Sequence, residues 1–298
     1  MNLYHPRYWP SWIGVALLRL LAYVPYATAC RLGRALGRLI QRLGGSRRRI
    51  ARRNLELCFP ELDDSARERL LHAHFEVLGV GLFEIAHAWW GKDADLRPLV
   101  EISGLENLQA AAARGKGVLL LSAHFTSLEI GGRFLSMHMQ FDAMYRQSDN
   151  PVFEWLLSRN RGRFCGEIIP RDSTKQMLRR IRAGHIVWYA PDQNTQRKKA
   201  VFPTFFGHIA ATTPATHKLA RLTGAAVVPF MAVRKDNDEG YRLVLEPPLD
   251  DFPTEDAVLD TQRINDILER WVRTYPEQYL WIHRRFRTRP TLEEPRMY

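Results

Sequence analysis

The chain has 298 residues, of which 46% are hydrophobic, and a formal net charge of +11 at pH 7. A chain of this length can bury one substantial core, so we expect one elaborated domain rather than two. Arginine dominates the basic residues, and its guanidinium group matches phosphate and carboxylate oxygens, so the charge indicates an anionic partner: nucleic acid, an acidic lipid surface or an acidic carrier protein. The three widely spaced cysteines, Cys30, Cys58 and Cys165, indicate reduced thiols rather than a disulfide framework or a metal site.

The N-terminal part combines an apolar segment with a basic one. Residues 11–24, "SWIGVALLRLLAYV", are almost entirely apolar but fall short of the ~20 residues that span a bilayer. Arginines then recur at helical spacing, and the polybasic block "SRRRIARR" occupies residues 46–53. This combination predicts attachment to a membrane that contains anionic lipid, with residues 1–45 as anchor and basic amphipathic helix and 46–298 as the main domain. The alternative is a core helix beside a solvated arginine face.

A helical pattern runs from Asp64 to about Trp90, and Asp63 or Asp64 is a suitable N-cap. From Val100 onward, candidate strands and helices alternate, which predicts an α/β fold with a mainly parallel central sheet flanked by helices and an N-terminal membrane-associated helix. The candidate strands are residues 118–122, 141–146, 186–190, 226–233 and 241–246. The candidate helices are residues 106–113, 127–137, 151–160, 174–183, 214–222 and 261–274.

Two titratable residues follow the first buried strand of this region. His124 comes directly after "VLLLSA", and Glu129 follows five positions later. Active sites form at such strand–loop–helix junctions at the carboxyl ends of parallel strands. If His124 lies on the loop and Glu129 in the next helix, the carboxylate can reach back to the imidazole, fix its tautomer and leave the other nitrogen as a general base. The two residues are therefore candidates for a base and its orienting group, or for two independently placed catalytic groups.

Other interpretations of this pair remain open. A single histidine after a strand is often structural, and the H-x4-E spacing arises readily by chance. A metal site is disfavoured, because ligands on one helical face need i, i+4 spacing and the sequence offers no third ligand. We predict neither a metal nor a cofactor.

Polar residues also accumulate at the later strand ends. Arg146 lies in "YRQSDNP", and Asp192 lies in "VWYAPDQN", directly after another buried strand. Arg161, Arg163 and Arg171 follow in "RNRGRF" and "IIPRD". Each motif alone is weak, because arginines commonly face solvent, but together they mark positions where ligand-facing side chains collect.

An ordered set of motifs extends over nearly the whole chain. The set is "HPRYW" (5–9), "RRNLELCFPE" (52–61), "HFTSLEIGGR" (124–133), "YRQSDNP" (145–151), "VWYAPDQN" (187–194), "AATTP" (210–214), "VVPF" (227–230) and "PEQYLWIHRRFRTRP" (276–290). In this set the chain resembles the late acyltransferases of lipid A biosynthesis, in the lauroyl or palmitoleoyl branch. That group belongs to the lysophospholipid acyltransferase-like superfamily, whose signature is H-x4-D/E.

The resemblance implies an α/β acyltransferase domain with an N-terminal membrane helix at the cytoplasmic face of a bacterial inner membrane. It implies transfer of a fatty acyl chain from acyl carrier protein to the hydroxyl of a 3-hydroxyacyl chain on a Kdo-lipid A precursor, Kdo2-lipid IVA. The expected acyl chain is lauroyl. His124 and Glu129 then inherit catalytic roles, and Arg146, Arg161, Arg163, Arg171 and Asp192 are expected to bind substrate. Backbone amides at the start of the helix after His124, or a nearby arginine such as Arg163, are candidates for stabilising the oxyanion.

Two alternatives accompany this interpretation. A glycerolipid or lysophospholipid acyltransferase would keep the chemistry, but its "EGTR"-type block is absent and "APDQN" stands in that region. A basic nucleic-acid-binding protein would use residues 31–53 against phosphates, but that segment also carries apolar residues and no nucleic-acid module is recognisable. We therefore expect no nucleic-acid partner.

Overall fold

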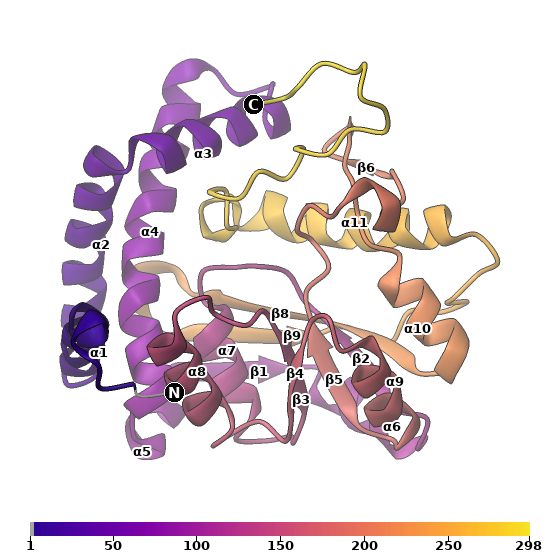
Figure 1. Ribbon diagram of the computed structural model, residues 1–298, viewed down its shortest axis with the longest axis horizontal. Coiled ribbons are helices and arrows are strands. Elements are labelled where there is room, and N and C mark those ends of the chain that lie inside the picture. Colours follow the sequence, from indigo (N-terminus) through magenta and orange to yellow (C-terminus); the bar gives the residue numbers. More distant parts are fainter. Residues whose placement is uncertain (1–2) are drawn as a thin grey trace.

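The computed structural model describes residues 3–298, in which a seven-stranded sheet forms the centre of the molecule (Figure 1). The strand order is β1-β9-β8-β2-β5-β3-β4, and neighbouring strands are parallel except for the antiparallel pair β8–β9. The strands of this sheet are β1 (Val100–Ser103), β2 (Val118–Leu121), β3 (Asp142–Tyr145), β4 (Ile168–Pro170), β5 (Ile186–Tyr189), β8 (Ala226–Arg234) and β9 (Tyr241–Leu245). A separate antiparallel pair consists of β6 (Thr204–Phe205) and β7 (His208–Ile209). The prediction of a mainly parallel α/β sheet is confirmed.

Helices cover both faces of this sheet (Figure 1). They are α1 (Trp9–Leu21), α2 (Tyr26–Leu43), α3 (Gly45–Cys58), α4 (Asp64–Trp90), α5 (Asp93–Leu96), α6 (Leu105–Ala113), α7 (Leu128–Leu135), α8 (Pro151–Arg161), α9 (Thr174–Arg182), α10 (Ala215–Thr223) and α11 (Ala257–Thr274). Asp63 caps α4 by accepting a hydrogen bond from the backbone N–H of Ala66, as the sequence predicts. The short strands β1, β4, β6 and β7 were not predicted, because two to four residues carry too little periodicity to separate a strand from a loop.

The alternation of side chains along each strand divides the core into two clusters. On β2, Val118 and Leu120 belong to one cluster, whereas Leu119 and Leu121 belong to the other. The first cluster includes residues of α6, α7 and α8, and the second includes residues of α3, α9, α10 and α11. The central strands β2 and β5 are buried on both faces and apolar throughout, which is why they are recognisable as continuous apolar runs.

Helices α2 and α4 lie side by side along one flank of the molecule, shown in indigo and purple in Figure 1. Glycines allow this close approach: an added Cβ at Gly37 would lie 2.0 Å from the Phe75 carbonyl oxygen, and one at Gly79 would lie 2.1 Å from that of Gly33. The N-terminal segment is thus packed on the main domain by backbone contact. The division of the chain at residue 45 stays a prediction.

The membrane helix implied by the resemblance has no counterpart that spans a bilayer. None of the helices formed by residues 3–298 combines the length and the hydrophobicity needed to cross one. Helix α1 is 13 residues long and carries its apolar side chains on an exposed stripe, namely Trp9, Ile13, Leu17 and Leu20.

Candidate functional site

The loop between β2 and α7 presents His124 at the carboxyl end of the sheet. The segment that follows α11 holds this loop through two backbone hydrogen bonds. Leu280 donates its N–H to the His124 carbonyl, and Thr126 donates its N–H to the Gln278 carbonyl. Ser127, fully buried, donates its hydroxyl to the Ala232 carbonyl at 2.7 Å and fixes the start of α7 to β8. The histidine is therefore attached to a loop that is bonded on both sides.

Asp192 is the carboxylate that contacts the His124 imidazole. Its Oδ1 lies 2.6 Å from Nδ1 of the ring, and its Oδ2 accepts the backbone N–H of His124 at 3.0 Å. Burial raises the pKa of Asp192, but the neighbouring His124 outweighs it and brings that pKa down to about 2. Burial lowers the pKa of His124, but the Asp192 charge outweighs it, so the imidazole pKa is higher than usual. An ionised Asp192 holds the proton on Nδ1 and leaves the lone pair on Nε2.

The sheet order explains why these two residues meet although 68 positions separate them. His124 follows β2 and Asp192 follows β5, and these strands are paired in parallel with Leu121 opposite Tyr189. Parallel neighbours end at the same edge, so the residues that follow them are placed side by side.

Glu129 does not bind His124, contrary to the expected pairing of the two. Within the described chain its carboxylate binds Arg161 and Trp89 instead: Arg161 Nη2 lies 2.5 Å from Oε2, Arg161 Nε lies 3.1 Å from Oε1, and Trp89 Nε1 donates to Oε1 at 2.6 Å. The physical reason is that Glu129 lies in the first turn of α7, beside α4 and α8, which supply these donors. Burial raises the pKa of Glu129, but the Arg161 charge outweighs it and keeps the carboxyl ionised.

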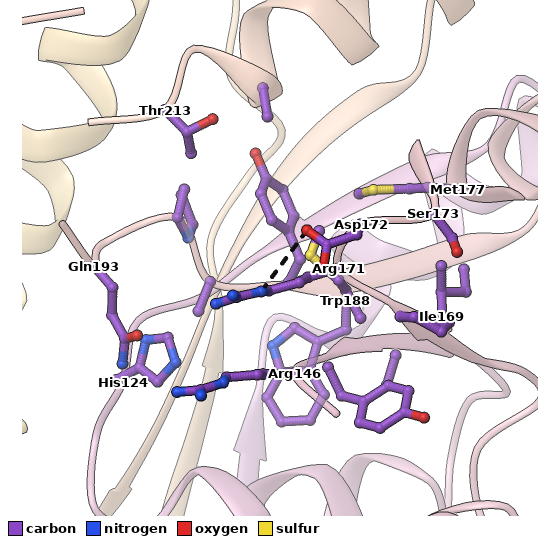
Figure 2. Close-up of a pocket in the computed structure, with 18 of the residues that line it drawn as sticks. His124, Arg146, Ile169, Arg171, Asp172, Ser173, Met177, Trp188, Gln193 and Thr213 are labelled. Atoms are coloured by element: carbon purple, nitrogen blue, oxygen red, sulfur yellow. Dashed lines mark ion pairs between the residues drawn. The ribbon is translucent and has the colours of Figure 1, made fainter. Parts of the chain in front are cut away.

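A cavity of about 1010 Å³ opens at this edge of the sheet, beside His124 (Figure 2). Glu129 and Arg161 also line it. Apolar side chains from both core clusters form much of the remaining wall. They include Leu128, Leu157, Phe164 and Trp188 on one face of the sheet, and Met144, Ile169, Met177 and Leu219 on the other. The cavity thus joins a polar centre to walls suited to hydrocarbon chains.

The structure places three of the four predicted arginines in this cavity. Arg146 and Arg171 line it with their guanidinium groups on the side of His124 (Figure 2), and Arg161 lines it beside Glu129. Arg146 lies 3.2 Å from Asp149, and Arg171 lies 3.9 Å from Asp172. Arg163 is not among the lining residues, and its Nη1 donates to the Trp89 carbonyl at 3.5 Å.

Further residues at the site were not predicted to bind substrate; of these, His283 and Arg287 lie in the motif of residues 276–290, whereas Trp89 and Lys199 lie outside all the motifs. Trp89 lies in the last turn of α4, Lys199 lines the cavity from a short 3-10 helix (Arg197–Lys199), and Arg287 lines it from the C-terminal segment. His283 accepts the backbone N–H of Asn194 through Nε2 at 3.0 Å, and burial lowers its pKa to about 4, so this imidazole is neutral at pH 7. Among residues 3–298, the His, Cys, Asp and Glu side chains form no group of three or more that is able to hold a metal ion.

The family profile and the curated relatives both point to one family. Residues 1–288 match the profile of the family described as bacterial lipid A biosynthesis acyltransferase. The chain is 39% identical over 289 residues to the lipid A biosynthesis lauroyltransferase of Escherichia coli K12, covering 97% of this chain and 94% of that protein. It is also 39% identical over 290 residues to the lipid A biosynthesis palmitoleoyltransferase of the same organism, with the same two coverages. One solved structure, the 1-acyl-sn-glycerophosphate acyltransferase PlsC of Thermotoga maritima, aligns with a TM-score of 0.41 and 12% identity over 88% of this chain and 97% of that chain.

Proposed function

Because the chain belongs to the family of bacterial lipid A biosynthesis acyltransferases, we propose that it transfers a lauroyl chain from acyl carrier protein to a Kdo-lipid A precursor. The acceptor is the hydroxyl of a 3-hydroxyacyl chain on Kdo2-lipid IVA, and the reaction takes place at the cytoplasmic face of the bacterial inner membrane. The family match also favours this function over glycerolipid acylation and over nucleic-acid binding.

The observation that carries the proposal is that His124, paired with the buried Asp192, lines a cavity that also has apolar walls. Asp192 fixes the proton on Nδ1, so Nε2 of His124 accepts the proton of the acceptor hydroxyl as its oxygen attacks the thioester carbonyl. The imidazolium then returns this proton to the departing thiolate. Burial of Asp192 keeps its negative charge close to the imidazolium that forms, which stabilises that cation.

The charges around the cavity fit acidic substrates. Arg146, Arg171, Lys199 and Arg287 line it, and guanidinium groups bind phosphate and carboxylate oxygens in pairs. A phosphorylated acceptor with Kdo carboxylates offers such oxygens, and so does the acidic surface of an acyl carrier protein. We propose that the cations on this rim bind the anionic groups of the substrates.

The exposed stripe on α1 supports attachment to the membrane. Trp12 on α1 packs against Trp155 on α8 with ring centroids 5.8 Å apart, and α8 borders the cavity through Leu157 and Arg161. Phe153 and Trp155 on α8 are themselves exposed at 36% and 40%. An apolar surface beside the cavity would bring a lipid acceptor to His124 without removing its chains from the bilayer.

The deciding experiment is mass spectrometry of lipid A from a strain that lacks this gene, with and without a plasmid that carries it. The gene is expected to restore the mass of one dodecanoyl chain, and a His124→Ala copy expressed at the same level is not. A competition assay then identifies the preferred acyl chain: the purified protein receives dodecanoyl- and palmitoleoyl-acyl carrier protein together with Kdo2-lipid IVA, and the acylated products are compared. An unchanged lipid A mass with the wild-type gene contradicts the proposal.

A further inference from the structure

We propose that Glu129 acts on Arg161 rather than on His124: with Trp89 it holds the guanidinium so that Nη1 donates a hydrogen bond to the oxyanion of the tetrahedral intermediate. Arg161 is then a catalytic residue, and Glu129 and Trp89 are positioning residues. This assignment rests on the proposed function and separates the two residues of the H-x4-E motif into two units.

The carboxylate of Glu129 is fully engaged by its two partners. Oε1 accepts from Trp89 Nε1 and from Arg161 Nε, and Oε2 accepts from Arg161 Nη2. Two parallel hydrogen bonds between carboxylate and guanidinium fix the plane of the arginine, and the indole N–H fixes the carboxylate. The side chains of Glu129 and Arg161 are only 11% and 18% exposed, so water competes little with these bonds.

One nitrogen of Arg161 is left over for a ligand. Nε and Nη2 are used by Glu129, whereas Nη1 has no protein partner among residues 3–298, and Arg161 lines the cavity. Arg161 is also close enough to His124 for its charge to lower the imidazole pKa. A donor that is fixed before the reaction and faces the developing charge is what oxyanion stabilisation requires.

Several of the donors expected from the sequence are engaged in other hydrogen bonds. The backbone N–H groups of His124, Phe125, Thr126 and Leu128 already donate, respectively, to Asp192, Ala123, Gln278 and Phe125. Arg163 does not line the cavity and donates to the Trp89 carbonyl. Arg161, which lines the cavity, therefore takes the role that the sequence analysis offered to Arg163.

The step uses an acyl thioester and an alcohol. The acceptor oxygen forms a bond to the thioester carbon while His124 Nε2 takes its proton, and the electron pair of the C=O bond moves to the oxygen that Arg161 Nη1 contacts. The pair then returns, the C–S bond breaks with its electrons on sulfur, and the thiolate takes the proton from His124. The products are an ester and a thiol, and Arg161 stays protonated throughout.

Kinetics of the purified full-length protein with dodecanoyl-acyl carrier protein and Kdo2-lipid IVA test the assignment. Arg161→Lys keeps the positive charge but removes the planar guanidinium group. We expect its kcat to fall about 100- to 1,000-fold, with the KM for each substrate within about threefold of the wild-type value. Glu129→Gln is expected to lower kcat in the same way, and Trp89→Phe, which removes one hydrogen bond, about tenfold. The double variant Glu129→Gln, Arg161→Lys should be little slower than Arg161→Lys alone. A raised KM at unchanged kcat in Arg161→Lys would make it a substrate-binding residue and overturn the proposal.

A second measurement needs no substrate and therefore separates this proposal from the proposed function. The pH dependence of carbethoxylation at His124, followed by mass spectrometry of its peptide, reports the imidazole pKa, which Asp192, Arg161 and His283 influence. Asp192→Asn is expected to lower that pKa, because the carboxylate that raises it is lost. Glu129→Gln is expected to lower the His124 pKa less than Asp192→Asn does. If Glu129→Gln lowers that pKa as much as Asp192→Asn, Glu129 acts on His124 and the proposal is contradicted. Arg159→Ala on α8, whose side chain lies over Trp155 outside the cavity, is the matched control for both measurements.

Discussion

Asp192 binds His124 twice, once at the ring and once at the backbone. Oδ1 lies 2.6 Å from Nδ1, and Oδ2 accepts the backbone N–H at 3.0 Å. One buried carboxylate therefore sets both the position of the loop and the tautomer of the imidazole. The acidic residue of the H-x4-E motif, which the sequence suggested for this purpose, serves another group.

The first prediction concerns this pair. His124→Ala should lower kcat about 10²- to 10⁴-fold, which is the usual contribution of a positioned base. Asp192→Asn should lower it substantially, because an amide that turns its NH2 toward Nδ1 places the proton on Nε2. The double variant should be little slower than His124→Ala, since residues that act as a unit are not additive. Steady-state kinetics check this, and multiplied losses would show that Asp192 acts on something other than the imidazole.

The second prediction concerns pH. The base must be neutral, and Asp192 raises the imidazole pKa above its usual value, so kcat/KM should fall as pH drops through a pKa above ~6.5. In Asp192→Asn no carboxylate opposes the burial that disfavours the His124 imidazolium, so the imidazole pKa should fall. The acid limb of the kcat/KM profile should then move to lower pH, and the maximal kcat/KM should be lower than that of the wild type. Arg161 and His283 also face this imidazole and remain in the variant. A pH–rate profile over pH 5–9 measures the shift, and an acid limb that stays in place would remove His124 as the titrating base.

The third prediction concerns a buried ion pair between α4 and β8. Glu84 Oε1 lies 2.5 Å from Arg234 Nη2, and the two side chains are 2% and 5% exposed. Glu84→Gln leaves the arginine charge buried without its partner, so the free energy of unfolding should fall by about 3–5 kcal/mol. Denaturant titration in detergent measures this. Arg52→Ala, which breaks the exposed pair with Glu68, is the control and should cost no more than about 1 kcal/mol; equal losses would refute the role of burial.

The fourth prediction concerns the exposed stripe of α1. Trp9, Ile13, Leu17 and Leu20 are 58–62% exposed, and replacing all four with Ser should release the protein from vesicles that contain anionic lipid. Vesicle sedimentation at low and high salt measures the bound fraction. The control replaces Val258 and Leu259 on α11, which are 45% and 51% exposed, with Ser and should sediment like the wild type. If the α1 variant still sediments at high salt, attachment depends on another surface.

The sequence by itself determined the elements that have a local cause. The apolar runs of β2 and β5 marked strands buried on both faces, and the pair Asp63 and Asp64 marked the start of α4, because burial and capping depend on neighbouring residues. The position of His124 after a buried strand likewise follows from the order of the chain. The ordered motifs indicated the family, which the match over residues 1–288 confirms.

The tertiary structure alone decided which side chains meet. Asp192 reaches His124 because β2 and β5 are neighbours in the sheet, and no periodicity in the sequence encodes that order. Trp89 and Arg161 reach Glu129 from 40 and 32 positions away, because α4 and α8 pack beside α7. Local pattern fixes the direction of a side chain within its own element, whereas its partner depends on how separate elements pack. This is why the sequence suggested Glu129 as a partner of His124, whereas the structure pairs His124 with Asp192.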